Sequence, residues 1–269
     1  MAYIRTVLLT SNSLRHKYIA HCLASKLDLA LIVTEKKSSR ITETDAFDED
    51  NAIFITQHFI ARETSEKKYF REYSEFPSNI PLLGIEHGEI NSSQVVKSIE
   101  KVTADYIILF GTSIIKDQLL EKYSRKIINL HLGLSPYYRG SATNLFPYFF
   151  GEPECIGGTI HLATAEVDKG EILHQFRPDI SPDDNLHDIG NKVILKGGEI
   201  LPKILKDYHA GKITPEGQKG SGKICRNTDL NPEVLKEIYR RFDAGLIEKY
   251  LADKRRRDEA KPIISNYAY

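Results

Sequence analysis

The chain has 269 residues, of which 41% are hydrophobic and 28% charged, a composition typical of a globular protein with one large domain or one domain and an extension. Its 37 basic and 37 acidic residues cancel, which argues against a nucleic-acid partner, and no apolar run is long enough for a membrane span. The first residues do not resemble a secretory signal, and the three cysteines, Cys22, Cys155 and Cys225, lack metal-ligand spacing. We therefore expect a cytoplasmic protein.

In the first half of the chain, short apolar runs alternate with helical patterns. Strands are predicted at 6–9, 29–33, 82–85, 105–111 and 127–132, and helices at 14–26, 51–74 and 92–101. Continuous apolar strands separated by helices form parallel sheets that are covered on both faces. Residues 36–50 are polar and lack a period, so a loop is predicted there.

After residue 150 the pattern changes. Two strands are predicted at 157–162 and 172–176, joined by a turn over 166–170, and a long helix over 185–208 follows them. The sequence therefore predicts a sheet that continues beyond its parallel part.

At the end of the chain, the sequence predicts a glycine-rich link over 211–222, followed by a charged helical tail. Asn231 is suited to cap a helix, Pro232 is suited to its first turn, and apolar residues recur behind them at helical spacing. A helix with one apolar stripe must bury it, so we expect the tail to pack on the rest of the chain or on a second copy, as a homodimer. We place one domain over 1–210 and a C-terminal extension over 211–269.

Asn129 and His131 are polar residues at the end of an apolar strand. Side chains two positions apart in a strand share a face, so this amide and this imidazole point the same way, and Leu130 points the other way. In open α/β sheets, ligands bind at the carboxyl ends of the strands. The interpretation without a function is a pair of hydrogen-bonded polar residues at a strand end.

Two further groups accompany this pair. Arg139 and Gly140 follow a turn stiffened by proline, and Asp168 stands in the turn that ends at Gly170. An amide, an imidazole and a carboxylate are the parts of an acyl-transfer site that needs no side-chain nucleophile: the imidazole moves protons, the carboxylate orients it, and the amide donates to the developing oxyanion. Ser135 is a weaker candidate as a nucleophile, because the Gly-x-Ser-x-Gly turn is absent.

Other patterns are less informative. The stretch GQKGSGKI at 217–224 has the spacing of a phosphate loop, but Ile224 stands where Ser or Thr is required, so a surface link is preferred. The turn from Ser11 to His16 offers either a plain helix cap or an anion site formed by backbone N–H groups and Arg15. Histidines in helical segments are predicted to lie on the surface: His58, His187 and His209.

In combination, these residues resemble the formyltransferases that use 10-formyltetrahydrofolate, which include the glycinamide ribonucleotide, methionyl-tRNA and amino-sugar nucleotide enzymes. Their shared pattern is Asn-x-His, a Leu-Pro-x-Tyr-Arg-Gly-like turn, Gly-x-Thr-x-His and Asp-x-Gly. The chain carries the parts in this order: Asn129–His131, Pro136–Gly140, Gly157–His161 and Asp168–Gly170. The resemblance covers roughly residues 5–182, and Ser135 departs from it because many relatives carry Leu there.

The resemblance implies an α/β fold, a mostly parallel, twisted, Rossmann-like sheet flanked by helices, with a short helical C-terminal extension. It implies an enzyme that takes its formyl group from 10-formyltetrahydrofolate and needs no metal, because that formyl group is already activated. By resemblance, the catalytic residues are Asn129, His131 and Asp168. The folate would contact Phe110, Gly111, Ile114, Arg139, Gly140 and Asp168. The substrate would contact Ser11, Asn12, Arg15 and Tyr138.

The amine that accepts the formyl group is less well defined. The turn after the first strand lacks the glycines with which the glycinamide ribonucleotide enzymes hold a phosphate, which disfavours purine synthesis. Too few residues follow the long helix for the OB-like domain of the methionyl-tRNA enzymes, and the net charge is zero. A small amine remains, and a nucleotide-linked amino sugar is the commonest in this family. The alternatives are a formyltetrahydrofolate hydrolase, a formyltransferase for another small amine, and a catalytically silent folate- or nucleotide-binding protein.

Overall fold

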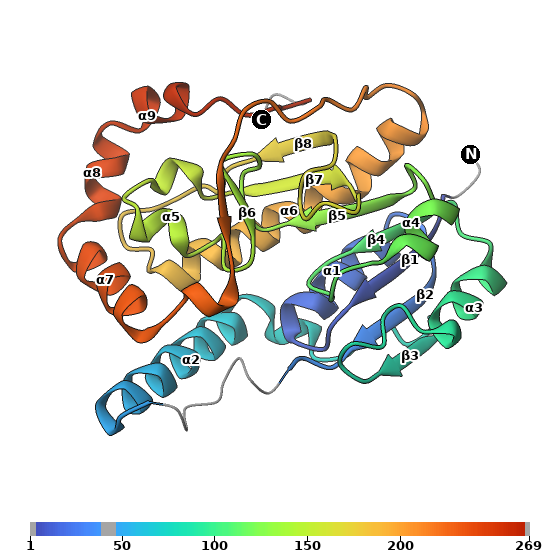
Figure 1. Cartoon of the computed structure of the whole chain (residues 1–269), viewed down its shortest axis with the longest axis horizontal. Helices are drawn as coiled ribbons and strands as arrows, with labels where there is room; N and C mark the ends of the chain where they lie inside the picture. Colours follow the sequence, from blue (N-terminus) through green and yellow to red (C-terminus); the bar gives the residue numbers. More distant parts are fainter. Residues whose placement is uncertain (1–3, 39–46, 267–269) are drawn as a thin grey trace.

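One seven-stranded sheet organises the part of the chain that the computed structural model describes, residues 4–38 and 47–266. Residues 39–46, within the loop predicted at 36–50, lie outside the described residues. The strands are β1 Arg5–Thr10, β2 Asp28–Glu35, β3 Leu82–Ile85, β4 Tyr106–Leu109, β5 Ile127–His131, β7 Gly158–Leu162 and β8 Ile172–Phe176. Their order is β3-β2-β1-β4-β5-β7-β8, parallel as far as β5 and antiparallel beyond it (Figure 1). The mostly parallel sheet predicted from the sequence is confirmed.

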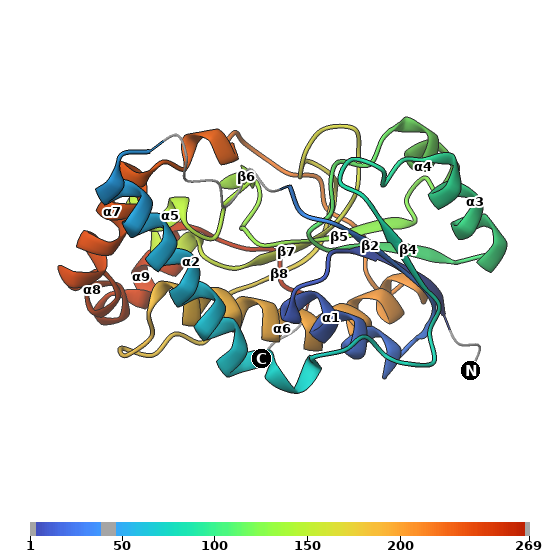
Figure 2. The ribbon, with the colours of Figure 1, turned by 90° about the horizontal axis from the view of Figure 1, so that it is seen from below.

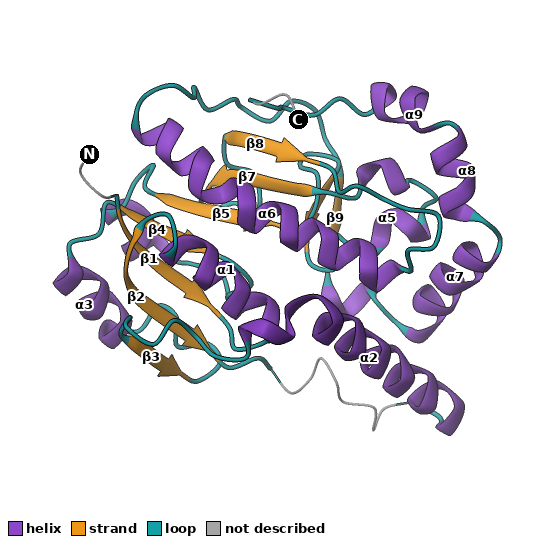
Figure 3. Cartoon of the chain, turned by 180° about the vertical axis from the view of Figure 1, so that it is seen from behind, coloured by secondary structure: helices purple, strands orange, loops and turns teal. Residues whose placement is uncertain are grey.

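Helices cover both faces of this sheet. The longer ones are α1 Leu14–Ala24, α2 Glu49–Phe70, α3 Ser93–Val102, α6 Leu186–His209 and α7 Pro232–Asp243. The shorter ones are α4 Asp117–Lys122, α5 Phe146–Phe149, α8 Leu246–Ala252 and α9 Lys254–Ala260. The helices α1 and α6 lie on one face, and α3 and α4 lie on the other (Figures 2 and 3). Among the helices of the described residues, none is both long and apolar enough to cross a membrane.

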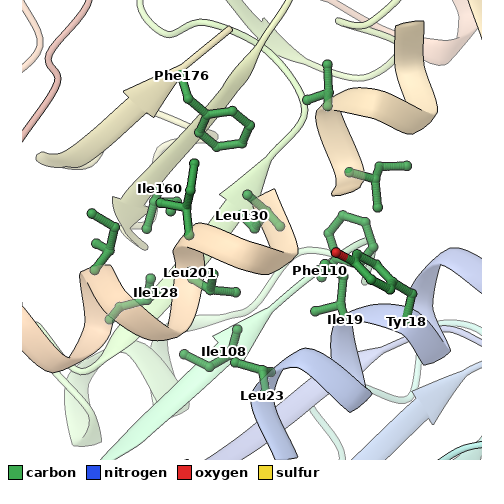
Figure 4. Close-up of a cluster of buried hydrophobic side chains, with 14 of the residues drawn as sticks. Tyr18, Ile19, Leu23, Ile108, Phe110, Ile128, Leu130, Ile160, Phe176 and Leu201 are labelled. Carbon is green, nitrogen blue, oxygen red and sulfur yellow. The ribbon is translucent and has the colours of Figure 1, made fainter. Parts of the chain in front are cut away.

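The alternation of side chains along the strands divides the core into two layers. Ile128, Leu130 and Ile160 pack with Leu201 of α6 in the first layer (Figure 4). The opposite face carries a second cluster under α3 and α4: Val7, Leu9, Ile107, Leu109 and Ile127. Because the even-numbered residues of β5 belong to the first layer, its odd-numbered polar residues project from the second face, as the strand pattern predicts.

The C-terminal extension packs on the rest of the chain. Asn231 caps α7 through its side chain and Pro232 occupies the first turn, as predicted. Leu235 and Ile238 of α7, together with Ile247 of α8, are buried in the same cluster as the strands. The apolar stripe is therefore buried within one chain, and it gives a homodimer no support. The domain boundary after residue 210 stays a prediction.

Residues 211–222 are not the plain surface link predicted from their glycines. Within them, Glu216 pairs with Ile172 through two backbone hydrogen bonds of 2.7 and 2.9 Å. Directly afterwards, β9 (Lys223–Cys225) pairs in parallel with β6 (Tyr138–Gly140) in a second, two-stranded sheet. In Figure 1, β9 is the unlabelled orange-red strand that runs beside β6 before the chain reaches α7. This pairing was not predicted, because strands of three residues show no period in the sequence.

The last described residues lie along the outer edge of β8. The Gln175 N–H donates to the carbonyl oxygen of Ile264 at 2.6 Å, and Oε1 of Gln175 accepts the Ile264 N–H at 3.0 Å. The backbone nitrogen of Asn266 lies 3.0 Å from Nδ1 of His174. The tail therefore covers part of an edge strand.

His58 and His187 form a cluster with Tyr239, which joins α2, α6 and α7. The Tyr239 hydroxyl lies 3.1 Å from Nδ1 of His58 and 3.2 Å from Nε2 of His187. The predicted surface position is wrong for His58, which is buried, and His187 is half-buried. Burial lowers the pKa of His58 to about 4 and that of His187 to about 3. Both rings are therefore neutral in the folded protein near neutral pH.

From the lowered pKa values of His58 and His187, we predict that acid destabilises the fold. In the unfolded chain each ring takes up a proton near its ordinary pKa of 6.5, whereas in the folded chain it does so only near pH 4 or 3. Between these values the unfolded state binds more protons, so the free energy of unfolding falls as the pH falls, by at most about 1.4 kcal/mol per pH unit for each histidine. Urea unfolding at about pH 7.5 and about pH 4.5 measures this effect. The free energy of unfolding is expected to fall less between these two pH values in His58→Gln than in the parent.

A matched control for this measurement is His209→Gln, because His209 also lies in a helix but is exposed. It is expected to keep the parental pH dependence. The same acid-induced loss in His58→Gln and in His209→Gln would contradict the assignment.

Candidate active site

Asn129, His131 and Asp168 meet on one face of the sheet. The first two project from β5, and Asp168 reaches them from the turn between β7 and β8. Nδ2 of Asn129 donates to Oδ1 of Asp168 at 3.1 Å, and Nδ1 of His131 lies 3.3 Å from Oδ2. The structure therefore brings together the three residues selected from the sequence, while their catalytic roles stay a prediction.

The Asp168 carboxylate is the acceptor around which the site is arranged. Besides Asn129 and His131, it accepts the Gly140 N–H on Oδ2 at 2.9 Å, and Nε2 of His161 lies 3.4 Å from Oδ1. Burial alone would raise the pKa of Asp168, but His131, His161 and the Gly140 N–H together hold it well below its ordinary value. The group is therefore a buried carboxylate ion that accepts N–H groups from Asn129, His131 and Gly140.

His131 has an acceptor beside each ring nitrogen. Nδ1 faces Asp168, and Nε2 lies 3.3 Å from the carbonyl oxygen of Tyr138 and 3.5 Å from Oγ1 of Thr143. Burial lowers the pKa of His131, and the Asp168 carboxylate only partly offsets this effect. The ring is therefore neutral near pH 7, yet a proton that it gains is stabilised by an adjacent carboxylate. This is the behaviour required of a general base that later acts as an acid.

His161 is a fourth member of the site, which belongs to one of the sequence motifs but was not predicted as a site residue. In the sheet it stands directly opposite Asn129. Its Nδ1 donates to the carbonyl oxygen of Leu162 at 2.9 Å, which leaves Nε2 to accept from Nδ2 of Asn129 at 3.1 Å. Both hydrogens of the Asn129 amide therefore have acceptors, Asp168 and His161. The signal for His161 was its place in Gly-x-Thr-x-His.

Ser135 is part of a structural network and not a nucleophile. Its backbone N–H donates to Oγ1 of Thr159 at 3.1 Å, and its carbonyl oxygen accepts from Nε2 of Gln175 at 2.6 Å. The Ser135 hydroxyl is fully buried, with no partner among the described residues. Such a hydroxyl is inaccessible to a substrate, in agreement with the absence of a nucleophile turn around Ser135.

The residues predicted to contact the folate differ in exposure. Phe110 is buried, with its ring centroid 5.2 Å from that of His16, whereas Gly111 is exposed and has a left-handed φ of +69°. Ile114 is 64% exposed. Nε of Arg139 is buried and has no partner within residues 4–38 and 47–266. Gly111 and Ile114 are thus open to a ligand, and contact with a folate stays a prediction.

The residues predicted to contact the substrate are only partly available. The Ser11 hydroxyl is buried and donates to the carbonyl oxygen of Glu35 at 2.9 Å, whereas Asn12 is exposed. Arg15 forms an ion pair with Glu66, in which both side chains are largely buried. Asn12 and Arg15 therefore remain candidates, whereas the Ser11 hydroxyl is not available to a substrate.

Tyr138 is not available to a substrate, which corrects the prediction from the sequence. Its side chain is fully buried, and its hydroxyl donates to the Glu152 carboxylate. Lys223 and Lys261, both from the C-terminal extension, lie 2.9 and 3.0 Å from the same carboxylate. Tyr138 therefore anchors β6 beneath the extension, a role that depends on residues far along the chain.

Three cationic side chains, which we call the cation cluster, gather near the first turn of α1: Arg15, Lys37 and Arg62. Loss of solvent around the ammonium, followed by the charges of Arg15 and Arg62, lowers the pKa of Lys37 to about 8, although the residue as a whole is exposed. Burial and then Arg15 lower the pKa of Arg62 to about 10. All three cations also depress the pKa of the buried His16, after burial itself. Within the described part of the chain, the Arg62 guanidinium has no hydrogen bond or ion pair, whereas Arg15 has Glu66.

The stretch 217–224 does not form a phosphate loop. Nε2 of Gln218 donates to the carbonyl oxygens of Asp168 and Gly170, and Nζ of Lys223 binds Glu152. Its residues therefore support the candidate site from behind, and Gln218 is a contact that no spacing in the sequence indicated.

Comparison with known proteins gives matches over much of the chain. The formyl transferase family profile matches residues 6–205. The methionyl-tRNA formyltransferase of Finegoldia magna is 26% identical over 120 residues, which are 44% of this chain and 38% of that protein. The chain spans less than half the length of the curated relatives that it matches.

Solved structures share the fold. The phosphoribosylglycinamide formyltransferase of Anaplasma phagocytophilum aligns with a TM-score of 0.57 and 16% identity over 84% of this chain and 99% of that one. A sugar N-formyltransferase of a Shewanella species aligns with a TM-score of 0.56 and 18% identity, over 88% and 87%. At identities this low, the structural alignments establish the fold alone. The family is established by the profile match, which spans most of the chain. The chain therefore belongs to the formyl transferase family.

Proposed function

We propose that the chain transfers a formyl group from 10-formyltetrahydrofolate to the amine of a small phosphorylated substrate, such as a nucleotide-linked amino sugar. The observation that carries formyl transfer is the convergence of Asn129, His131 and Asp168 in a member of the formyl transferase family. Transfer requires a donor to the oxyanion, a group that moves a proton and a group that orients both. These three side chains supply one each.

In the proposed reaction, the amine attacks the formyl carbon and the carbonyl electrons move to oxygen. His131 takes the proton that the amine loses and, once protonated beside Asp168, stabilises the oxyanion together with Asn129. One such donor is worth a factor of about 10² to 10³ in rate. Collapse of the oxyanion breaks the carbon–nitrogen bond to the folate, whose nitrogen receives the proton from His131. The products are a formamide and tetrahydrofolate.

Asn129 must exchange a partner during this reaction. Its two amide hydrogens already have acceptors, Oδ1 of Asp168 and Nε2 of His161. A developing oxyanion is a stronger acceptor than a neutral imidazole, so the bond to His161 is the one that the substrate oxygen replaces. The bond to the Asp168 carboxylate is kept and holds the amide in place.

The formyl donor fits beside this group of residues, on the side of Gly111. That glycine is exposed, and the Lys37 ammonium donates to its carbonyl oxygen. Ile114 and Val167 are 64% and 46% exposed, and they suit contact with the flat ring system of a folate.

The cation cluster supports a phosphorylated substrate. The charges of Arg15 and Arg62 act on Lys37, and the Glu35 and Glu66 carboxylates offset only part of the positive charge of this cluster. Phosphate oxygens relieve such repulsion and accept the bidentate donors of the Arg62 guanidinium, which has no partner among the described residues. The backbone N–H of Arg15 is already taken by Glu66 at 3.1 Å, so the side chains, and not the helix end, provide the attraction.

The position of the cation cluster relative to the triad suits an amino sugar. Leu9 of β1, Leu109 of β4 and Asn129 of β5 lie side by side in the sheet. Two strand spacings, about 10 Å, therefore separate the end of β1 from Asn129. A hexose that carries its amine at one end and a diphosphate at the other spans a gap of this size.

A nucleic-acid substrate is the competing proposal, because curated relatives are named methionyl-tRNA formyltransferases. We favour the small substrate because the net charge is zero and the basic residues of α9 are paired, as in Arg255 with Glu259 and Arg256 with Asp253. A cytoplasmic location, a homodimer, and the lack of nucleic-acid and membrane partners stay predictions from the sequence.

The first test replaces His131 with Gln. Loss of a general acid–base group is expected to lower kcat by about 10² to 10⁴. The unfolding midpoint is expected to stay close to that of the parent, because the Gln amide can still donate to the buried Asp168 carboxylate. Release of tetrahydrofolate, followed by absorbance with an amino-sugar nucleotide as acceptor, measures the effect. Turnover within tenfold of the parent removes His131 from the chemistry.

The second test concerns the substrate's phosphate and replaces Arg62 with Gln. The KM for a nucleoside-diphosphate amino sugar is expected to rise about 10- to 100-fold, the value of one or two lost charge-assisted hydrogen bonds. The KM for the same amino sugar without its nucleotide is expected to stay unchanged. Arg255→Gln is the control, because the Arg255 side chain is 92% exposed. Equal effects of Arg62→Gln on both acceptors contradict phosphate binding here.

The third test separates transfer from hydrolysis. Formate and the formamide product are both quantified with and without an amine acceptor. We expect the formamide to exceed formate at least tenfold when the acceptor is saturating, because a bound amine is held close to the formyl carbon whereas water is not. Formate as the main product under both conditions would instead identify a hydrolase.

A further inference from the structure

Gln218 connects the C-terminal extension to the turn that carries Asp168. Its Nε2 donates to the carbonyl oxygens of Asp168 at 2.7 Å and of Gly170 at 2.9 Å. Both partners are acceptors, so the amide nitrogen and not the oxygen must face them. Two residues earlier, Glu216 is fixed to Ile172 by a pair of backbone hydrogen bonds. Gln218 therefore approaches the turn from a segment that is itself held in place.

The turn requires support from outside itself. Asp168 has a φ of +49°, in the left-handed region that few residues other than glycine adopt, although Asp and Asn do so more often than the others. Gly170 is packed so closely that an added Cβ would lie 1.7 Å from the carbonyl oxygen of Leu162. Inside the turn, the hydrogen bond from the Lys169 N–H to the Glu166 carbonyl is long, at 3.4 Å. The two hydrogen bonds from Gln218 are shorter than this internal one, and they hold the backbone of Asp168 itself and of Gly170.

We propose that Gln218 is a positioning residue for formyl transfer, which holds the Asp168 carboxylate in register with His131. The carboxylate meets its partners at 2.9 to 3.3 Å on both oxygens, so a shift of the turn by about 1 Å breaks several contacts together. Gln218 lies outside residues 6–205, which the family profile matches. The C-terminal extension is then part of the active-site machinery. The catalytic part of this inference rests on the proposed function.

Gln218→Met is the sharpest variant. Methionine keeps the length of the side chain and removes the donor, and Oε1 of Gln218 has no partner to lose among the described residues. We expect kcat to fall about 10- to 100-fold while both KM values change less than about threefold. Gln118→Met, at an exposed position in α4, is the control and is expected to match the parent.

A double-mutant cycle shows whether Gln218 acts through Asp168. In an Asp168→Asn background, Gln218→Met is expected to lower kcat by less than about twofold further, because residues that act as a unit are not additive. A purely structural role gives the same loss in both backgrounds. That result, or a kcat of Gln218→Met within twofold of the parent, overturns the proposal.

A third measurement needs no substrate and keeps the two proposals apart. NMR titration of the histidine ring protons, with His131→Gln to identify the signal, gives the pKa of His131 beside its titratable neighbours Asp168 and His161. Asp168 raises this pKa, so Gln218→Met is expected to lower it by about 0.5 unit or more. An unchanged titration overturns the positioning role. A shifted titration in a protein that transfers no formyl group overturns the proposed function alone.

Discussion

A single buried carboxylate determines how the candidate site is built. An unpaired charge at the position of Asp168 would cost several kcal/mol, so neighbouring elements direct N–H groups at it: β5 through Asn129 and His131, and β6 through Gly140. The partners that neutralise the carboxylate are also those that it orients. The stability of the turn and the chemistry of the imidazole are therefore two results of one set of hydrogen bonds.

The sequence was informative where one element decides the outcome. The alternation along β5 places Asn129 and His131 on one face, and the Asn-Pro pair locates the start of α7. Prediction from the sequence failed where segments that are distant in the chain come into contact. The strands β6 and β9 are too short for a period, and their pairing joins residues far apart in the chain. The burial of His58 depends on Tyr239, which arrives with the extension.

Tyr138 and Gln218 show the limit of motifs. A motif identifies which residues a family uses at one position, but it does not say which later segment covers them. Tyr138 sits in a recognisable turn, yet Lys223 and Lys261 cover it through their shared bonds to Glu152. Gln218 lies in a glycine-rich stretch that suggests a plain link, and only the folded chain brings its amide to the turn of Asp168.

The covered edge of β8 has a consequence for how the protein behaves in a crowded solution. A free strand edge offers unpaired N–H and carbonyl groups to any extended chain nearby, which is a common route to fibrils and swapped assemblies. Ile264 and Asn266 occupy part of that edge in β8. As segments of the same molecule, they compete at an effective concentration of the order of millimolar, above that of most neighbours. The chain thus carries its own inhibitor of strand addition.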